Sequence, residues 1–573
     1  MYITIQNICT INNTLFNVVQ ILRSSDMYIA RSRSKSASGK VYESILLRES
    51  YREGDKVKNR TIANLSKHSP TEIRALEFAL KNKDNPLILS TDSFQIDQGR
   101  SIGSILVLQI LLDRLSITKA LGNSFQAKLA LWLIIARIVE QGSRLSATRL
   151  NAIYDIASII DLKRGFDENN LYESLHWLDE NQQKIEDFLF KQNKYSGQLY
   201  WYDVTSSYFE GQKNELAAYG YNRDNKKRKK QIVIGLLTIN NGLPISVEAF
   251  QGNTQDTQTF QSQLNKLQTR FGCKNVILVG DRGMIRKKQK KLTREYGFQY
   301  VTALTLPEIK TLLKQNLLQL DNFKTELQST SHEGIRYLYR RNPERAKETQ
   351  NQRQERLSTA QKRVDRENTM LEAKPKSLSE TAKNRTEKYL KRLCISGWVS
   401  VCINERQLNL EIDLAKLEER SKFDGCYIWT TELTDDEASD REIYDRYKDL
   451  KFVENDFREL KTNFLEVRPI YVRTPESTRG HLLVTMLSYM VLRELRQAWN
   501  KLDLTVSEGL RILSTICQNT IKCSDGISIE MIPSPSEEAK NLLTALNIQL
   551  PKTIKESKIR VVTRKKTKSS VQQ

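Results

Sequence analysis

The segment between residues 197 and 304 alternates strand-like and helix-like patterns, and this order limits the fold more than any other feature of the chain. Three β-branched and aromatic runs come first, followed by an apolar-periodic helix, a buried strand, a second helix and a last strand. Such alternation predicts an α/β core with a mixed sheet. The predicted strands are 197–209, 231–240, 243–250, 275–280 and 298–304. One helix is predicted at 259–271, and a second follows the strand 275–280 and ends near residue 296.

Two aspartates occupy unusual positions in these predicted strands. Asp203 interrupts the run YWYDVTSSYF, although aspartate is depleted in strands and seldom buried without a partner. Asp281 directly follows the apolar run ILVG, at the carboxyl end of a strand, where α/β proteins place their binding sites. A single strand-end aspartate is equally compatible with a helix cap or a turn. Two such residues on strands that can be neighbours favour a shared site.

A third acid lies on a helix predicted from Ser439 to about Phe464. The helix begins with SDRE, a capping-box pattern, and carries an apolar stripe at Val453, Phe457, Leu460 and Phe464. Tyr447, Glu454 and Lys461 are spaced by seven residues, which places them on one helix face, and Arg458 follows Glu454 by four. This pattern is compatible with a metal and phosphate site. It is also compatible with a solvated Glu454–Arg458 ion pair.

The flanking segments are less informative. Residues 40–64 predict a hairpin around the turn REGDK, whose basic edge suits a phosphate backbone or an ordinary solvated surface. The helical stretch 101–195 is compatible with a helix-turn-helix or with simple core helices. Beyond residue 305, a strand near 335–341, a charged helical run at 343–368 and shorter apolar runs at 393–403, 408–414 and 426–431 suggest an insertion within the core.

Composition points to a polyanionic partner. Lys and Arg number 90 against 68 Asp and Glu, a formal charge of +22, and a basic excess of this kind suits nucleic acid. Seven scattered cysteines and four distant histidines have no zinc-site spacing. The apolar stretches are too short to cross a membrane, which together with free thiols predicts a cytoplasmic, nucleoid-associated protein. Met27 resembles a protein start, so residues 1–26 are compatible with an upstream extension.

The chain resembles the DDE transposases of bacterial insertion sequences, in the IS-four-like branch with a β-rich insertion and a tyrosine–arginine–glutamate–lysine signature. The resemblance covers most of residues 28–495. Leu450 stands where the signature usually has arginine. The matching stretches, in the family's order, are the hairpin at 40–64, YDVTSSYFEG, GYNRDNKKRKKQIVIGL, GNTQDTQTF, VGDRGM, YKDLKFVENDFRELK, VRPIYV and RGHLL.

The resemblance implies an RNase H-like mixed-sheet core interrupted by a β-rich insertion and preceded by an N-terminal hairpin and helical DNA-binding regions. The expected parts are an N-terminal hairpin region at 1–100, a helical DNA-binding region at 101–195, the first part of the core at 196–306, the insertion at 307–425, the second part of the core at 426–500, and a C-terminal helical region with a basic tail at 501–573.

In such a core, Asp203, Asp281 and Glu454 converge on one pocket as catalytic and metal-binding residues. Three crowded carboxylates repel one another unless cations neutralise them. Oxygen-only ligands favour two Mg²⁺ ions, with Mn²⁺ as a substitute, and such a pair stabilises the attacking and leaving oxygens of an in-line displacement. The implied reaction is DNA cleavage at transposon ends followed by strand transfer into target DNA.

The implied partners are double-stranded DNA, as terminal inverted repeats and target, and a second copy of the chain in a homodimer on paired ends. Trp398 and Trp429 are candidate stacking platforms for a flipped base and equally candidate core aromatics. His481 is a candidate near the site or a structural histidine. The expected DNA-contacting residues are Tyr447, Arg458, Lys461, Lys229, Lys230, Arg282, Trp398 and Trp429.

Two other interpretations stay open. A nuclease or resolvase on the same fold would share the carboxylates without joining strands. A non-catalytic DNA-binding protein derived from a transposase would not need the three acids. The inverted-repeat sequence and the target preference do not follow from the sequence.

Overall fold

The computed structural model describes residues 27–36, 39, 41–81, 94–192, 199–221, 223–224, 226, 228–239, 242–461, 465, 469–523 and 528–563. The chain divides into two compact units, one formed by residues up to 97 together with 519–530, the other by 98–518 and 531–573. Within the described ranges, no helix combines the length and the apolar character needed to cross a membrane. The predicted extension at 1–26 and the tail from residue 564 fall outside these ranges.

The first unit contains a three-stranded antiparallel sheet and a helix. Strands β1 (Met27–Lys35), β2 (Val41–Glu53) and β3 (Lys56–Asn64) pair in chain order, and helix α2 (Pro70–Lys81) follows. The hairpin predicted at 40–64 is confirmed, and Gly54 takes the positive φ that its tight turn requires. The small core contains Met27, Leu47, Leu65, Ile73 and Leu80. Strands β4 (Phe94–Asp97), β15 (Asn519–Cys523) and β16 (Ser528–Met531) form a second small sheet.

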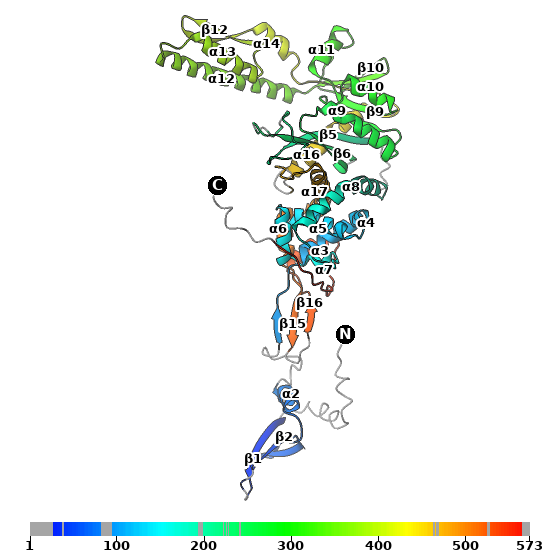
Figure 1. The fold of residues 1–573 in the computed structure, drawn as a ribbon, viewed down its shortest axis with the longest axis vertical. Helices are drawn as coiled ribbons and strands as arrows, with labels where there is room; N and C mark the ends of the chain where they lie inside the picture. The colour runs from blue at the N-terminus through cyan, green and yellow to red at the C-terminus, as the bar shows by residue number, and fades with distance from the viewer. Residues whose placement is uncertain are drawn as a thin grey trace. The chain divides into compact units, whose positions relative to one another are not determined.

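The second unit is built around an eight-stranded mixed sheet (Figure 1). Its first five strands in chain order lie as β7-β6-β5-β8-β9, with β5, β8 and β9 parallel and β6 and β7 antiparallel to their neighbours. This is the RNase H-like arrangement that the sequence analysis predicted. The bounds are β5 (Leu199–Tyr208), β6 (Gln231–Ile239), β7 (Leu243–Gln251), β8 (Ile277–Val279) and β9 (Gln299–Ala303).

Three further strands extend this sheet beyond β9. Strand β14 (Cys426–Thr431) pairs with β9, β11 (Ile335–Arg341) pairs with β14, and β10 (Gln328–His332) forms the edge. Strands β10 and β11 therefore belong to the sheet, although their residues fall inside the stretch expected to form the insertion.

Helices cover both faces of the sheet because its strands bury side chains on both sides. Tyr200, Tyr202 and Val204 of β5 belong to one core, together with residues of α9 (Asp256–Asn265) and the adjoining π-helical turn η5 (Lys266–Arg270). Trp201 belongs to the larger core on the other face, under α16 (Leu450–Lys461) and α17 (Pro475–Trp499). Figure 1 shows α9 and α10 (Lys287–Glu295) on one side of β5 and α16 and α17 on the other. Asp203 alternates with Tyr202 and Val204, so it shares the α16 face with Trp201.

The helical region shares the core of the α17 face. Its α5 is buried along nearly its whole length, as the apolar run 129–136 requires. The helices are α3 (Gly103–Arg114), α4 (Ile117–Leu121), α5 (Phe125–Val139), α6 (Arg144–Arg149), α7 (Ile156–Ile159), α8 (Glu168–Gln192), α18 (Val506–Leu513) and α19 (Glu537–Ala545).

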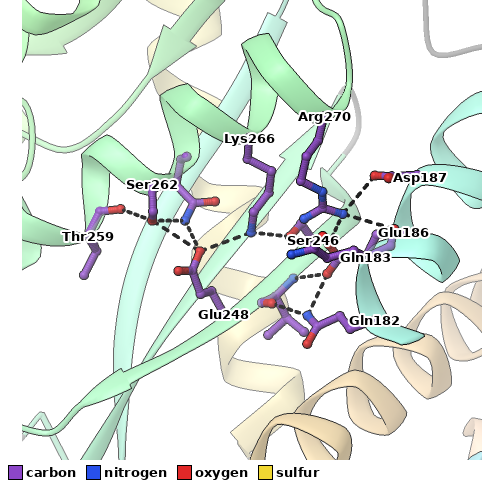
Figure 2. A network of polar contacts seen from close by, with 12 residues as sticks. Gln182, Gln183, Glu186, Asp187, Ser246, Glu248, Thr259, Ser262, Lys266 and Arg270 are labelled. Atoms are coloured by element: carbon purple, nitrogen blue, oxygen red, sulfur yellow. Dashed lines mark hydrogen bonds and ion pairs between the residues drawn. The ribbon is translucent and has the colours of Figure 1, made fainter. Parts of the chain in front are cut away.

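A buried polar network connects α8 to the sheet (Figure 2). The Glu186 carboxylate is fully buried and accepts hydrogen bonds from Ser246 Oγ at 3.0 Å and Val247 N at 3.3 Å, both on β7. Arg270 of η5 forms ion pairs with Glu186 at 3.0 Å and with Asp187 at 2.9 Å. These contacts fix the helical region against β7 of the large sheet.

The insertion between β11 and β14 contains more helix than strand, unlike the predicted β-rich segment. It contains α12 (Pro343–Ala373), α13 (Ser379–Arg392), the hairpin of β12 (Val399–Asn404) and β13 (Gln407–Ile412), and α14 (Leu414–Ser421). The charged run at 343–368 forms most of α12, as predicted. The insertion has its own core, to which Trp398 belongs with 4% of its surface exposed.

The helix predicted from Ser439 to about Phe464 is interrupted. It begins with the predicted capping box at Ser439 and Glu442, but α15 (Asp440–Lys448) ends there with Asp449 as its C-cap residue, and α16 starts at Leu450. No proline or glycine marks this break in the sequence. The predicted stripe of Val453, Phe457 and Leu460 is buried in α16, whereas Phe464 lies outside the described residues.

Candidate active site

The register of the parallel strands β5 and β8 sets the relative position of the two aspartates. Leu199 pairs with Ile277 and Trp201 with Val279, an offset of 78 residues. Asp203 and Asp281 have the same offset, so extending this register by two residues brings them level. Asp281 follows the end of β8 by two residues, and its Oδ2 accepts a hydrogen bond from Gly283 N at 3.3 Å. The predicted position of Asp281 at the end of the fourth core strand is confirmed.

Helices α15 and α16 bring the third acid to this edge of the sheet. Trp201 Nε1 donates a hydrogen bond to the carbonyl oxygen of Arg446 at 2.9 Å, which holds α15 against β5. Glu454 lies one turn into α16 and is exposed, whereas Val453 beside it is fully buried. The acid therefore faces away from the core while its helix is fixed by the apolar stripe.

Asp203, Asp281 and Glu454 line one open cavity of about 760 Å³. The structure thus brings the three predicted acids to the same cavity, together with Tyr447, Arg282 and Trp429 from the predicted set. Sequence reasoning assigned no role to several other lining residues, which are Tyr221, Arg223, Asp256, Arg340, Arg345, Tyr427, Tyr444 and Lys448.

The cavity makes ionisation of Asp203 unfavourable. Burial raises the pKa of Asp203 to about 7, and the like charges of Asp281 and Glu454 add to this effect. The Val204 N–H and the Arg223 guanidinium act in the opposite direction. Tyr447 also has a raised pKa because of its burial and the nearby Asp281, so it remains a neutral phenol that can donate a hydrogen bond.

The donor set suits divalent cations that prefer oxygen ligands. Three carboxylates line one cavity, and burial together with the like charges of Asp281 and Glu454 opposes ionisation of Asp203. Across the described ranges, no group of three or more His, Cys, Asp or Glu side chains is arranged to hold a metal ion. The chemistry therefore fits Mg²⁺ or Mn²⁺, but holding an ion would require the three carboxylates to move closer together.

Arg223 and Asp256 form an ion pair within the lining of the cavity, near Asp203. Arg223 Nη2 donates hydrogen bonds to both carboxylate oxygens of Asp256, at 2.6 and 2.5 Å. Asp256 is the first residue of α9, so the pair fixes the loop before β6 to the start of this helix. Both residues lie in the stretches GYNRDNKKRKKQIVIGL and GNTQDTQTF. The sequence therefore marked both stretches, but that Arg223 pairs with Asp256 is seen only in the folded structure.

Lys461 differs from its predicted role as a DNA contact. Its Nζ lies 3.3 Å from Asp224 Oδ1, and both side chains are almost completely buried. Asp224 Oδ2 also accepts a hydrogen bond from Tyr208 N at 3.1 Å. Lys461 lies beside a separate small apolar cavity rather than in the acidic one. In this structure it connects α16 to the loop after β5.

The other predicted DNA contacts are dispersed. Arg458 is exposed and donates a hydrogen bond to Asn455 Oδ1 at 2.7 Å, and Lys229 forms an ion pair with Glu210 at 2.7 Å. Lys230 is exposed near the start of β6. None of these three lines the cavity with the acids, nor does Trp398, which lies in the core of the insertion.

Three aromatic side chains form a cluster among the residues that line the same cavity. Trp429 of β14 is packed edge-on against Tyr444, with ring centroids 4.9 Å apart, and stacked with Tyr427 at 5.9 Å. Arg340 of β11 donates a hydrogen bond to the Tyr444 hydroxyl at 3.1 Å. The Trp429 Nε1–H is buried and finds no hydrogen-bond partner among the residues that the structure describes. Trp429 and Tyr444 are 5% and 6% exposed and belong to the large core, so Trp429 fits its predicted alternative as a core aromatic, and only the half-buried Tyr427 offers ring surface to the cavity.

An RNase H-like core whose central strands and following helix present acids to one cavity defines a class of nucleic-acid phosphoryl-transfer proteins. Residues 194–491 match the transposase DDE domain, and residues 29–87 match the N-terminal domain of the IS1634 family of transposases. The first match covers more than half of the chain and contains all three acids. The chain belongs to the DDE transposases.

The chain was also compared with solved structures and with curated proteins. The cryo-EM structure of a piggyBac transposase synaptic complex with hairpin DNA is similar over 72% of this chain and 76% of that chain, at 10% sequence identity and a TM-score of 0.35. No curated protein matches the sequence.

Proposed function

We propose that this protein catalyses metal-dependent DNA cleavage at the ends of its own element and joins the freed ends to target DNA. The observation that carries this proposal is the shared cavity of Asp203, Asp281 and Glu454 within the DDE domain. The level positions of the two aspartates on parallel strands support it, because parallel strand ends are where this fold class places chemistry.

Asp203, Asp281 and Glu454 would hold the divalent cations. When bound, such ions stabilise the attacking and leaving oxygens of an in-line phosphoryl transfer. The chain's own groups position the DNA strand. Arg282 and Lys451 at the cavity rim suit phosphate oxygens, and neutral Tyr447 can donate a hydrogen bond to one of them.

The partner is double-stranded DNA, as terminal repeats and as target, and two copies of the chain would act on paired ends. The net charge of +22 supports the DNA partner. The half-buried ring of Tyr427 would stack on an unpaired base, and Trp429 beside it would take part only if the cavity opened further. Lys229, Lys230 and Arg458 would contact the backbone outside the cavity.

The test uses purified protein with Mg²⁺ and a duplex carrying the repeat boundary of its own element. We expect wild-type protein to cut at the boundary and Glu454→Gln to lose at least about 100-fold in rate, because one acid is removed from the site. Glu459→Gln on the same helix is the matched control, since Glu459 pairs with Arg496 and lies outside the cavity. Equal cutting by wild type and Glu454→Gln would remove Glu454 from the mechanism.

The same assay distinguishes the other interpretations. A nuclease or resolvase would cut without producing joined products between the element end and a second duplex. A non-catalytic DNA-binding protein would bind the duplex and produce neither product at any Mg²⁺ concentration.

A further inference from the structure

The three-stranded sheet of the first unit, dark blue in Figure 1, has two faces that differ in chemistry. Helix α2 covers one face, where Met27 and Leu47 share a small core with Leu80 of the helix. Successive side chains of a strand point to opposite faces, and residues paired across two strands share a face. The register of β1, β2 and β3 therefore assigns the residues that alternate with Leu47 to the opposite face, which we call the outward face.

The outward face carries no carboxylate within these three strands. Glu43, Glu49 and Glu53 are the acids of the strands, and all three lie on the α2 face. Glu49 forms an ion pair there with Arg60 at 2.6 Å. The residues of the outward face are neutral except for two arginines, and they are Tyr28, Ala30, Ser32, Ser34, Tyr42, Ser44, Leu46, Arg48, Ser50, Arg52, Val57, Asn59, Thr61 and Asn64.

Hydrogen bonds across the outward face confirm that these side chains lie side by side. Ser50 Oγ donates to Asn59 Oδ1 at 2.7 Å. Arg48 Nε donates to Thr61 Oγ1 at 3.5 Å. Arg52, Asn59 and Thr61 are exposed to solvent. A guanidinium has five N–H donors, and an amide has both donors and an acceptor. The outward face therefore has the capacity to bind a further polar partner that lies flat against the sheet.

The outward face suits the major groove of double-stranded DNA. A strand rises about 3.4 Å per residue, so Arg48 and Arg52 on the central strand are about 14 Å apart, or about four base-pair steps. The outer strands lie about 10 Å apart, and the groove is about 12 Å wide. Arginine binds guanine edges, asparagine binds adenine edges, and serine and threonine bind either. A face without carboxylates also avoids repulsion by the phosphates that border the groove.

We propose that the outward face reads base edges in the major groove of the element's terminal repeats, with Arg48 and Arg52 binding guanines. The inference rests on the proposed function, because it takes duplex DNA as the partner, and it adds which surface recognises the DNA sequence. It differs from a contact between the basic hairpin edge and the phosphate backbone, since phosphate contacts carry no sequence information. An ordinary solvated face would not affect sequence preference.

The experiment measures how full-length protein discriminates between two duplexes in EDTA, so that it does not depend on catalysis. One fluorescent duplex carries the repeat of the protein's own element, and the other has the same composition in scrambled order. Anisotropy gives both dissociation constants at several salt concentrations. The variants are Arg48→Gln and Arg52→Gln, and Arg33→Gln is the matched control, because Arg33 is an exposed arginine on the α2 face of the same sheet. Thermal unfolding checks that each variant is folded.

We expect wild-type protein to prefer the repeat, and Arg48→Gln and Arg52→Gln each to weaken binding to the repeat at least about fivefold while changing binding to the scrambled duplex much less. Arg33→Gln should keep the wild-type ratio of the two dissociation constants. The proposal is wrong if wild type binds both duplexes equally, or if both variants keep the wild-type ratio. Equal weakening of both duplexes, with a salt slope lower by about 1, would make the arginines phosphate contacts and also overturn it.

A chemical change in the DNA gives a second readout, in wild-type protein. Replacing single guanines of the repeat by 7-deazaguanine removes a major-groove acceptor and leaves the phosphates intact. We expect at least one such replacement to weaken binding at least about fivefold. The same replacement should cost Arg48→Gln or Arg52→Gln much less, because the contact is already lost in that variant. Replacements without effect at every guanine would contradict the proposal.

The proposed function and this inference fail in different ways. Wild-type protein that cuts at the repeat boundary, but whose sequence preference depends neither on Arg48 and Arg52 nor on the guanine N7 atoms, would overturn the inference alone. Protein that prefers the repeat and loses this preference in both variants would support the inference, whatever Glu454→Gln does to cleavage.

Discussion

Asp203 and Asp281 lie level on neighbouring parallel strands, because their separation along the chain equals the 78-residue register offset of β5 and β8. Each is held by its own local structure, Asp203 by the strand ladder with β6 and Asp281 by the turn after β8. Their relative position is therefore set by the strand register and by the short turn after β8. The register brings two cation ligands to one edge of the sheet, and the three carboxylates would still have to move closer together to hold an ion.

Divalent metal affinity should rise with pH through about 7. Metal binds the ionised carboxylate, and Asp203 with a pKa of about 7 is mostly protonated below that pH. We expect apparent Mn²⁺ affinity, measured by calorimetry between pH 5.5 and 8.5, to fall up to about tenfold per pH unit below 7. Arg223→Gln should move this midpoint to higher pH, because the guanidinium favours ionised Asp203. A pH-independent affinity would contradict the role of Asp203.

Asp203→Asn should stabilise the metal-free protein above neutral pH. The folded-state pKa of Asp203 is raised from 3.8 to about 7, so the folded state binds more protons than the unfolded state between these values. Stability of the wild type then falls as pH rises from about 4 to 7, and stays low above 7. We expect Asp203→Asn to gain on the order of 2 kcal/mol at pH 8 in EDTA. Denaturant unfolding at pH 4 and pH 8 measures the difference, which should nearly vanish at pH 4.

Lys461→Met should destabilise the fold more than it weakens DNA binding. The substitution leaves buried Asp224 without its cation, and breaking a buried pair in this way costs about 3 kcal/mol. Lys461→Met combined with Asp224→Asn should recover much of that loss, because the amide oxygen still accepts from Tyr208 N. Denaturant unfolding and duplex anisotropy measure the two effects. A stable Lys461→Met protein with weak DNA binding would instead make Lys461 a phosphate contact.

Glu186→Ala should loosen the helical region from the sheet. The substitution removes the acceptor for Ser246 and Val247 inside the network of Figure 2, so we expect a loss of about 3 kcal/mol in unfolding free energy. Asp187→Asn is the matched control, because Asp187 binds the same Arg270 but is one-third exposed. We expect less than about 1 kcal/mol for it. Similar losses for both variants would contradict a special role of the buried carboxylate.

The strands of the core were predictable because their patterns are local. The predicted strand near 335–341 coincides with β11, and the apolar run noted at 426–431 forms β14, because β-branched and aromatic runs bounded by polar residues determine a strand through short-range preferences. The insertion and the helix at 439–464 were predicted less well. The break at Asp449 carries no proline or glycine, so it depends on how α15 and α16 each pack against β5.

Some residues of the candidate site could likewise be identified from the sequence, and others could not. Asp203, Asp281 and Glu454 stood out in the sequence because each acid sits beside an apolar pattern that fixes its neighbours. The partners Arg223–Asp256 and Lys461–Asp224 did not, because side chains separated by 33 and 237 residues meet only after the sheet forms. Sequence by itself determined the order of strands, the three acids and the basic charge. Only the tertiary structure decided which cations face the acids and which are buried in ion pairs, since that choice depends on burial and distance between distant segments.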